Sequence, residues 1–226
     1  MTGAGHFIVL EGGEGAGKTT MAAALAAWVR AEITPQVLCV REPGSTPLCE
    51  RIRGLLRDPG DEAPCPACEL LLLYAARCQL LEGVIRPRLQ QGYVVIGDRH
   101  ELSTLAYQGG GRQLPAGLLE QLRAAVLGSF RPQLTLLLDL EPRLGLERAR
   151  RRGGGDRFEA EQLPFFERVR AAYLQAASAD PSVCVVDASA APQQVQAAVI
   201  AAVQAYFART AADGGESGAG RSGAPP

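Results

Sequence analysis

The sequence contains almost no lysine. Of its 23 Lys and Arg residues, only Lys18 is a lysine, so the other 22 are arginines with guanidinium groups. Arg is a planar, rigid fork, whereas Lys is a compact charge on a flexible stem. The single ammonium lies in the segment Gly-Gly-Glu-Gly-Ala-Gly-Lys-Thr-Thr at residues 12–20. We therefore expect Lys18 to have a specialised role that guanidinium groups do not fill.

Long hydrophobic runs and an excess of charge are also lacking. No apolar run reaches the roughly 18 residues that a membrane-spanning helix needs. The formal net charge is −1, whereas nonspecific nucleic-acid binding needs a basic surface. No basic segment followed by an apolar stretch opens the chain, so we expect no signal peptide. The composition predicts a cytoplasmic protein with neither a nucleic-acid nor a membrane partner.

Cysteine and histidine do not form a metal-binding pattern. Among the six cysteines, Cys65 and Cys68 have C-x-x-C spacing, but a zinc site would need a second such pair. The two histidines, His6 and His100, fall in no ligand pattern. We expect free thiols in a reducing compartment, with a redox-active C-x-x-C pair as the alternative.

Short apolar runs alternate with helical stretches along the chain. The predicted strands are 6–11, 36–41, 93–97, 133–139 and 182–187. The predicted helices are 18–31, 47–57, 68–90, 115–127, 142–151, 159–178 and 192–208. Alternation of this kind favours parallel pairing with crossover helices. The fold class is therefore α/β, a three-layer fold in which a five-stranded parallel sheet is flanked by helices.

The chain divides into one domain and a tail. At 226 residues it is long enough to bury a substantial single core, which we place at 1–210. Residues 211–226 are rich in Ala, Gly, Ser, Asp, Glu and Pro, and they lack large aliphatic side chains. We expect this tail to be disordered because it cannot bury enough apolar area.

The segment around Lys18 matches the phosphate-binding loop G-x-x-x-x-G-K-T. An apolar strand precedes it and an Ala- and Leu-rich helix follows it, which is the setting the motif requires. Backbone N–H groups of such a loop wrap phosphates, its Lys reaches the terminal pair and its Thr binds Mg²⁺. The predicted ATP-binding residues are Gly12, Gly13, Glu14, Gly15, Ala16, Gly17, Lys18, Thr19 and Thr20.

Polar residues follow the predicted strands, and ligands of parallel sheets bind at that edge. Asp98 ends an apolar strand and, together with Thr19, is the candidate Mg²⁺ ligand, directly or through water. Asp139 ends another strand, where we expect a helix cap instead. Arg41, Arg77 and Arg99 are candidate clamps for a second, phosphate-bearing substrate, because guanidinium binds phosphate with two hydrogen bonds.

An arginine cluster joined to three glycines spans residues 148–158. We expect it to be a short mobile lid that closes over a nucleotide, excludes water and brings a cation to the transferring phosphoryl group. The catalytic candidates there are Arg152 and Arg157, which the sequence does not rank against Arg148, Arg150 and Arg151. A charged helix end with a flexible loop is the alternative.

Several segments together resemble bacterial thymidylate kinases. They are Glu11–Thr20, Arg-Glu-Pro-Gly at 41–44, Tyr-Ala-Ala-Arg at 74–77, Asp-Arg-His at 98–100, Ser103-Thr104, Tyr-Gln-Gly-Gly-Gly-Arg at 107–112, Phe-Arg-Pro at 130–132 and Asp-Arg-Phe-Glu at 156–159. They occur in the order and approximate spacing of the family over roughly residues 6–208. The resemblance implies a P-loop kinase fold and transfer of the ATP γ-phosphate to thymidine monophosphate (dTMP), with Mg²⁺ and as a homodimer.

The resemblance also implies roles for individual residues. Arg41 and Arg99 would hold the acceptor phosphate, Arg77 would read the thymine edge, and Glu14 would approach the acceptor sugar. Ser103, Thr104, Tyr107 and Gln108 would line the acceptor pocket. By the same resemblance, Lys18, Glu14 and Arg99 join the lid arginines as catalytic residues.

Three positions distinguish this chain within the family pattern. Gly15 stands where some members carry a loop arginine, so the chain resembles the design with a lid arginine. Ser45 replaces a second glycine, which implies either a steric cost at positive φ or a cap for the next helix. The aromatic expected to stack on thymine is Leu73 here. Tyr74 follows it, rotated by about 100° along a helix, so either residue is a candidate for the base contact.

Two other functions remain open at this point. A deoxynucleoside kinase, or a kinase for another nucleoside monophosphate, would use the same loop, Asp98, Arg99 and lid. A nonenzymatic guanine-nucleotide switch would need the base-reading motif N-K-x-D, which a chain with Lys18 as its only lysine lacks.

Overall fold

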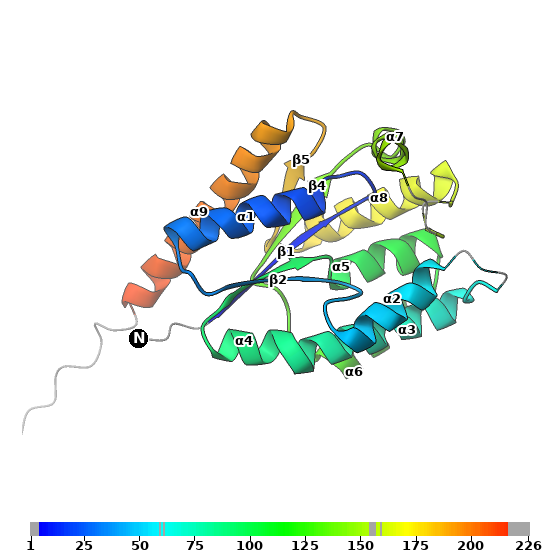
Figure 1. The fold of residues 1–226 in the computed structure, drawn as a ribbon, viewed down its shortest axis with the longest axis horizontal. Helices are drawn as coiled ribbons and strands as arrows, with labels where there is room; N and C mark the ends of the chain where they lie inside the picture. The colour runs from blue at the N-terminus through cyan, green and yellow to red at the C-terminus, as the bar shows by residue number, and fades with distance from the viewer. Residues whose placement is uncertain (1–4, 59, 61, 154–156, 159, 217–226) are drawn as a thin grey trace, which may run out of the picture.

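The computed structural model describes residues 5–216 apart from 59, 61, 154–156 and 159, and it contains the predicted parallel sheet (Figure 1). The strands are β1 (His6–Gly12), β2 (Val37–Arg41), β3 (Val94–Asp98), β4 (Leu134–Asp139) and β5 (Val183–Asp187), in the order β2-β3-β1-β4-β5. All four pairings are parallel. Within the described residues, no helix is both long enough and apolar enough to cross a membrane. The predicted α/β fold class and all five strands are confirmed.

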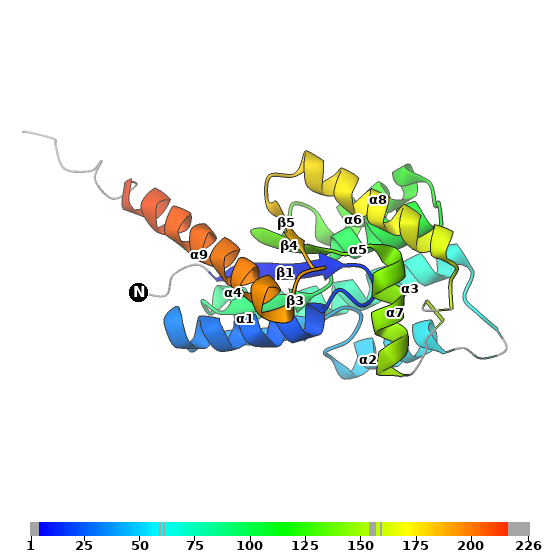
Figure 2. The same cartoon turned by 90° about the horizontal axis from the view of Figure 1, so that it is seen from above.

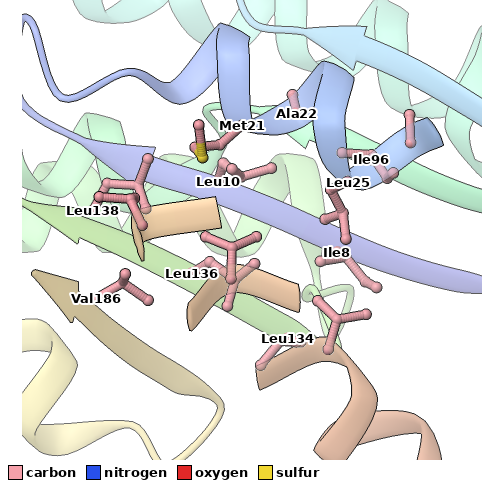
Figure 3. Close-up of a cluster of buried hydrophobic side chains, with 14 of the residues drawn as sticks. Ile8, Leu10, Met21, Ala22, Leu25, Ile96, Leu134, Leu136, Leu138 and Val186 are labelled. Carbon is pink, nitrogen blue, oxygen red and sulfur yellow. The ribbon is translucent and has the colours of Figure 1, made fainter. Parts of the chain in front are cut away.

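Both faces of the sheet are buried, which explains why its strands are nearly continuous apolar runs. Along β1, Ile8 and Leu10 point into one cluster, whereas Phe7 and Val9 point into another on the opposite face. Figure 3 shows the first cluster, where Leu25 lies beside the strand residues Ile8 and Ile96. Successive side chains of a strand alternate between faces, so a single short run supplies both cores.

Helices cover the two faces and make the three layers (Figures 1 and 2). One face carries α1 (Lys18–Glu32) and α9 (Pro192–Glu216), which lie side by side. The other helical segments are α2 (Pro47–Arg57), α3 (Pro66–Leu80), η1 (Leu81–Ile85), α4 (Arg86–Gln90), α5 (Glu101–Thr104), η2 (Leu105–Gly111), α6 (Ala116–Leu127), α7 (Pro142–Arg152) and α8 (Leu163–Ala179). The segments η1 and η2 are π-helical.

The structure differs from the sequence predictions mainly at the ends of helices. Helix α9 continues to Glu216, so the first part of the tail expected to be disordered is helical, and 217–226 lie outside the described residues. Helix α7 continues to Arg152, so the expected lid at 148–158 begins as regular helix. Of that lid, 154–156 lie outside the described residues, as does 159 at the expected start of α8.

The helical segment formed by α5 and η2 was not predicted. It ends in three glycines, Gly109 to Gly111, which have low intrinsic helix propensity. Tertiary packing compensates, because η2 lies against α8. A methyl group on Gly110 would come within 2.9 Å of the Arg168 carbonyl oxygen, and one on Gly111 within 2.4 Å of the Phe165 ring. These glycines therefore permit close approach of two helices.

Gly110→Ala should destabilise the protein, although Gly→Ala within a helix usually stabilises it. The added methyl group would meet Ala172 Cβ at 2.7 Å as well as the Arg168 carbonyl, and overpacking costs about 1–3 kcal/mol. The matched control is Gly117→Ala in α6, where an added methyl group meets nothing within 4 Å. Urea unfolding should show a lower free energy of unfolding for Gly110→Ala and an unchanged or higher one for Gly117→Ala. Equal values would contradict the close-packing explanation.

Candidate active site

The carboxyl ends of β1, β2 and β3 meet at one cavity of about 290 Å³. The pairing register of the strands explains why these ends lie together, because Asp98 pairs with Leu10 on one side and with Arg41 on the other. Most of the predicted site residues line this cavity. They are Glu14, Gly15, Gly17, Lys18, Thr19, Thr20, Arg41, Leu73, Asp98, Arg99, Ser103, Thr104, Tyr107 and Gln108.

The loop between β1 and α1 holds Lys18 at the N-terminus of α1. The Lys18 ammonium donates to the carbonyl oxygens of Gly12 at 3.0 Å and Gly13 at 2.7 Å. Burial lowers the pKa of Lys18 to about 8, although the carboxylates of Glu14 and Asp98 act in the opposite direction. The loop therefore presents a poorly solvated ammonium whose charge a phosphate would stabilise. Ala16 belongs to the core behind the loop.

Thr19 and Asp98 form the candidate Mg²⁺ site. The Thr19 hydroxyl donates to the Asp98 carboxylate at 2.7 Å across the mouth of the loop. Hydroxyl and carboxylate oxygens are hard ligands that suit Mg²⁺, which usually keeps several waters and shares substrate phosphates. The described residues contain no group of three or more His, Cys, Asp or Glu side chains that could hold a metal ion. The donor set therefore fits an ion that the nucleotide also coordinates.

Asp139 does not cap a helix as expected. Both of its carboxylate oxygens accept from the Arg170 guanidinium at 2.8 Å. The cap of α7 is Glu141, whose side chain accepts from the Leu144 N–H at 3.1 Å. The expectation failed because the capping position lies two residues further along the chain than the end of the strand.

The loop has no room for an arginine at position 15. Gly15 has φ of 69°, and a methyl group there would come within 2.1 Å of the Gly145 carbonyl oxygen. A methyl group on Gly145 would in turn meet the Glu14 carbonyl oxygen at 2.3 Å. The backbones of the loop and of α7 therefore touch through two glycines, which is consistent with the design that carries its arginine in the lid.

Arg99 connects the loop to the second half of the cavity. Its guanidinium donates to Glu14 at 2.9 Å, to the Gly12 carbonyl at 3.1 Å and to the hydroxyls of Ser103 at 3.1 Å and Tyr107 at 3.2 Å. Arg99 also has a positive φ of 72°, a conformation that non-glycine residues adopt mainly where the surroundings enforce it. The network fixes a guanidinium between the loop and the candidate acceptor pocket.

Glu11 is a buried site residue that the sequence prediction missed. Its carboxylate accepts from the His100 N–H at 2.7 Å, the Ser103 hydroxyl at 2.6 Å and the Tyr173 hydroxyl at 3.1 Å. Burial raises the pKa of Glu11, and the hydrogen bond from Ser103 is the strongest opposing influence. Glu11 thereby holds the backbone that follows Arg99. A polar residue inside an apolar strand was the available signal.

Arg41 and Ser45 are held by a carboxylate on α2. The Arg41 guanidinium, half exposed, pairs with Glu50 at 2.9 Å, and the Ser45 N–H donates to the same carboxylate at 2.7 Å. Ser45 has φ of 71°, so it adopts the left-handed conformation that glycine prefers. It does not cap α2, because Thr46 does so by accepting from the Cys49 N–H. Of the two alternatives for Ser45, the structure therefore has the residue at positive φ with its steric cost, and not as a helix cap.

Tyr74 and Arg77 are buried and are not among the residues that line the cavity, so the base-contact roles considered for them stay predictions. Tyr74 is buried, and its hydroxyl donates to Glu101 at 2.7 Å. Arg77 is 2% exposed and donates to Glu42 at 2.7 Å and Glu101 at 2.8 Å. Of the two candidates for the base contact, Leu73 is the one that lines the cavity, because one residue along α3 turns Tyr74 toward α6.

Six further residues line the cavity without having been predicted. They are Glu42, Pro43, Arg53, Leu56, Arg57 and Phe158. Arg53 and Arg57 are four residues apart on α2, and residues at this spacing share a face of a helix. That spacing could have indicated from the sequence that the two arginines face the same side. Leu56 and Phe158 extend the apolar lining that Leu73 begins, which suits a planar base.

None of the lid arginines whose side chains the structure describes lines the cavity. Arg148 donates to the Ala188 carbonyl oxygen at 2.9 Å, and Arg151 pairs with Glu147 on the same helix. Arg157 contacts the Glu69 carboxylate and donates to the Leu56 carbonyl oxygen at 3.2 Å. Arg152 ends α7, and its side chain lies outside the described part of the structure. The catalytic assignment of Arg152 and Arg157 stays a prediction.

Comparison with known proteins identifies the family. The family model described as thymidylate kinase matches residues 10–199. The chain is 49% identical over 203 residues to a thymidylate kinase of Idiomarina loihiensis, covering 90% of this chain and 98% of the relative. It is 52% identical over 200 residues to one of Shewanella loihica, covering 88% and 94%. A crystal structure of thymidylate kinase from Ehrlichia chaffeensis, 28% identical, superposes with a TM-score of 0.73 over 89% of this chain and 100% of that one. The cavity that joins a phosphate-binding loop to a second, arginine-lined pocket is therefore that of a phosphotransferase, and the chain belongs to the thymidylate kinase family.

Proposed function

We propose that the chain transfers the γ-phosphate of ATP to dTMP, giving ADP and dTDP, with the loop around Lys18 as the donor site and the adjoining pocket as the acceptor site. One observation carries the proposal. Lys18 and Thr19 share a single cavity with Arg41 and Arg99, so a donor triphosphate and an acceptor phosphate would meet there. Membership of the thymidylate kinase family supports dTMP over the other acceptors that the loop and Asp98 would allow.

At the donor end, the protein stabilises charge and does little covalent chemistry. Residues 12–20 wrap the phosphates of ATP, and the Lys18 ammonium neutralises charge on the β- and γ-phosphates. Thr19 and Asp98 would hold Mg²⁺, directly or through water. When bound, the ion would neutralise the charge that develops on the phosphate oxygens. The Lys18 ammonium, the Thr19 hydroxyl and the Asp98 carboxylate already lie together at the loop. The site therefore needs little reorganisation when the nucleotide binds.

At the acceptor end, guanidinium groups position the dTMP phosphate for attack on the γ-phosphorus. Arg99 is fixed by Glu14 and Tyr107, and Arg41 by Glu50, so both enter the complex with defined geometry. Glu14 faces the acceptor sugar, while Leu73 and Gln108 lie where the base would sit. Arg152 or Arg157 would supply a further cation from the lid, which also excludes water so that ATP is not hydrolysed.

The assembly and the location are part of the same proposal. We expect a homodimer, as in the family, and the exposed leucines of the neighbouring helices α2 and α3 support it. Leu55 is 60% exposed and Leu71 is 56% exposed, and apolar side chains of this kind suit a subunit interface. A cytoplasmic location follows from the substrates, because both nucleotides are made and consumed there.

A substrate panel tests the proposed reaction directly. With saturating ATP and Mg²⁺, the purified protein should form ADP with dTMP at a higher kcat/KM than with the other deoxynucleoside monophosphates or with thymidine. The physical reason is that Arg41 and Arg99 need an acceptor phosphate and that the base pocket fits one pyrimidine. If the protein prefers an unphosphorylated nucleoside or another monophosphate, dTMP is not its acceptor. The assignment of the donor site would still stand.

Nucleotide binding should take up protons at mildly alkaline pH. Burial lowers the pKa of Lys18 to about 8, so a growing fraction of its side chain is the neutral amine as the pH rises above that value. Phosphates favour the charged form and raise the pKa, so binding draws a fraction of a proton at pH about 8.5 and less at pH 7. Calorimetry of ADP binding in buffers of different ionisation enthalpy measures this uptake.

The control for proton uptake is Lys18→Arg, because a guanidinium stays charged throughout this pH range. That variant should show little uptake at either pH. Equal uptake by the variant and the wild type would mean that another group titrates, and it would contradict the environment described for Lys18.

Asp98→Asn should raise the Mg²⁺ concentration needed for half-maximal activity by roughly tenfold or more, the usual cost of losing a metal-orienting carboxylate. The amide keeps the size of the side chain, so the fold should be unaffected. Asp139→Asn is the matched control, since Asp139 also ends a strand of the sheet, β4, but pairs with Arg170 outside the cavity. Activity is measured as a function of Mg²⁺ concentration for both variants. If the two curves coincide, Asp98 is not part of the metal site.

A further inference from the structure

Glu69 is a fully buried carboxylate that the reaction described above does not use. It lies in the first turn of α3, and its side chain is 0% exposed. Gln108 donates to its Oε1 at 2.7 Å. Arg112 donates to both oxygens, at 3.3 Å and 3.2 Å, and Arg157 donates to Oε2. A buried charge needs such partners. One of them, Gln108, also lines the cavity, so the carboxylate can influence the shape and polarity of the site.

The contact with Glu69 determines which way the Gln108 amide points. A carboxylate held by two guanidinium groups can only accept hydrogen bonds, so it must face the NH₂ end of the amide. The other end of the amide is then Oε1. Among the described residues, the Gln108 side chain has no second hydrogen-bond partner, and its Oε1 is not a buried, unpaired atom. Gln108 lines the cavity, so an acceptor oxygen faces the space where the base would lie.

An acceptor at this position distinguishes between pyrimidines. Thymine carries a hydrogen on N3 and can donate there, whereas N3 of cytosine is an acceptor. An acceptor facing an acceptor leaves both groups unpaired and repels them, which is the strongest way for a site to reject a ligand of the same size. If the amide were reversed, its NH₂ would favour cytosine instead. The polarity of one amide therefore selects the base.

We propose that Glu69 is a positioning residue that fixes the Gln108 amide with its oxygen toward the acceptor base, and that it thereby selects a pyrimidine with an N3–H donor over cytosine. The inference rests on the proposed function, because it takes Gln108 as part of the base pocket. It adds a residue that touches neither substrate and acts only through the orientation of another side chain.

Glu69→Gln gives the sharpest test because it replaces one carboxylate oxygen by NH₂ and changes little in volume. In the wild type Oε2 accepts from both Arg112 and Arg157, whereas the only guanidinium contact of Oε1 is the longer one from Arg112 Nε at 3.3 Å. The remaining oxygen of Gln therefore stays at the Oε2 position. Its NH₂ then occupies the position of Oε1 and donates toward Gln108. The Gln108 amide must reverse to accept, which turns its NH₂ toward the base.

The measured quantity is the ratio of kcat/KM for dTMP to kcat/KM for deoxycytidine monophosphate (dCMP). Glu69→Gln should lower this ratio about tenfold or more, the usual effect of a mismatched buried hydrogen bond. Glu120→Gln is the matched control, because Glu120 is an exposed carboxylate on α6 that pairs with Arg123. It should leave the ratio unchanged. An equal loss of activity on both substrates in Glu69→Gln would show a merely structural role and overturn the inference.

Gln108→Leu separates this inference from the proposed function. If Gln108→Leu leaves the ratio unchanged, Gln108 does not contact the base and the proposed pocket fails together with the inference. If Gln108→Leu lowers the ratio and Glu69→Gln does not, the pocket stands and only the inference fails. In the double variant, Glu69→Gln should produce no further change in the ratio, because its effect passes entirely through Gln108.

A measurement on the wild-type protein covers the case in which Glu69→Gln does not fold. The side-chain NH₂ of Gln108 can be assigned by NMR from its loss in Gln108→Leu. It should be protected from exchange with solvent in the free protein, and it should stay protected with little shift when dTMP is added, because Glu69 holds it in both states. An NH₂ that exchanges freely, or that shifts strongly on binding, would contradict the proposed orientation.

Discussion

The parallel register of three strands is the constraint on which the site depends. Asp98 at the end of β3 lies beside Leu10 of β1 and Arg41 of β2, so the segments that follow these strands begin at one edge of the sheet. The loop around Lys18 and the backbone that carries Arg99 therefore reach the same cavity, although they are far apart in the sequence. Because both faces of the sheet are buried against helices, a shift of register would exchange the two cores. The stability of the fold and the geometry of the site thus have one origin.

Carboxylates then orient the cations that this edge collects. Glu14 holds Arg99, Glu50 holds Arg41, and Glu69 holds Arg157. A flexible guanidinium in a cleft would otherwise sample many orientations, and ordering it would weaken substrate binding. The same pairing keeps like charges from repelling one another before the phosphates arrive. In the proposed function, these carboxylates would hold the charge that the substrates need in place before the substrates bind.

Local patterns allowed much of this to be predicted. Continuous apolar runs indicated the strands, and the strand–glycine loop–helix sequence located Lys18 and Thr19. Glu11 could have been noticed as a polar residue in an apolar strand, but its partners could not be predicted. Glu69 could not be found in this way, because a single carboxylate on a helix has no local pattern and acquires its partners only through the fold. The choice between Leu73 and Tyr74 depended on a rotation of one residue about α3. The segment α5–η2 depended on packing against α8, which outweighs the low helix propensity of its glycines.

A crystal structure with dTMP and a nonhydrolysable ATP analogue would show whether donor and acceptor meet in one cavity. The β- and γ-phosphates of the analogue should contact Lys18 and the backbone of residues 12–20. The phosphate of dTMP should lie between Arg41 and Arg99, with its base against Leu73 and Gln108. A triphosphate bound away from the loop, or no space for dTMP beside Asp98, would show that the cavity is not the site of phosphoryl transfer.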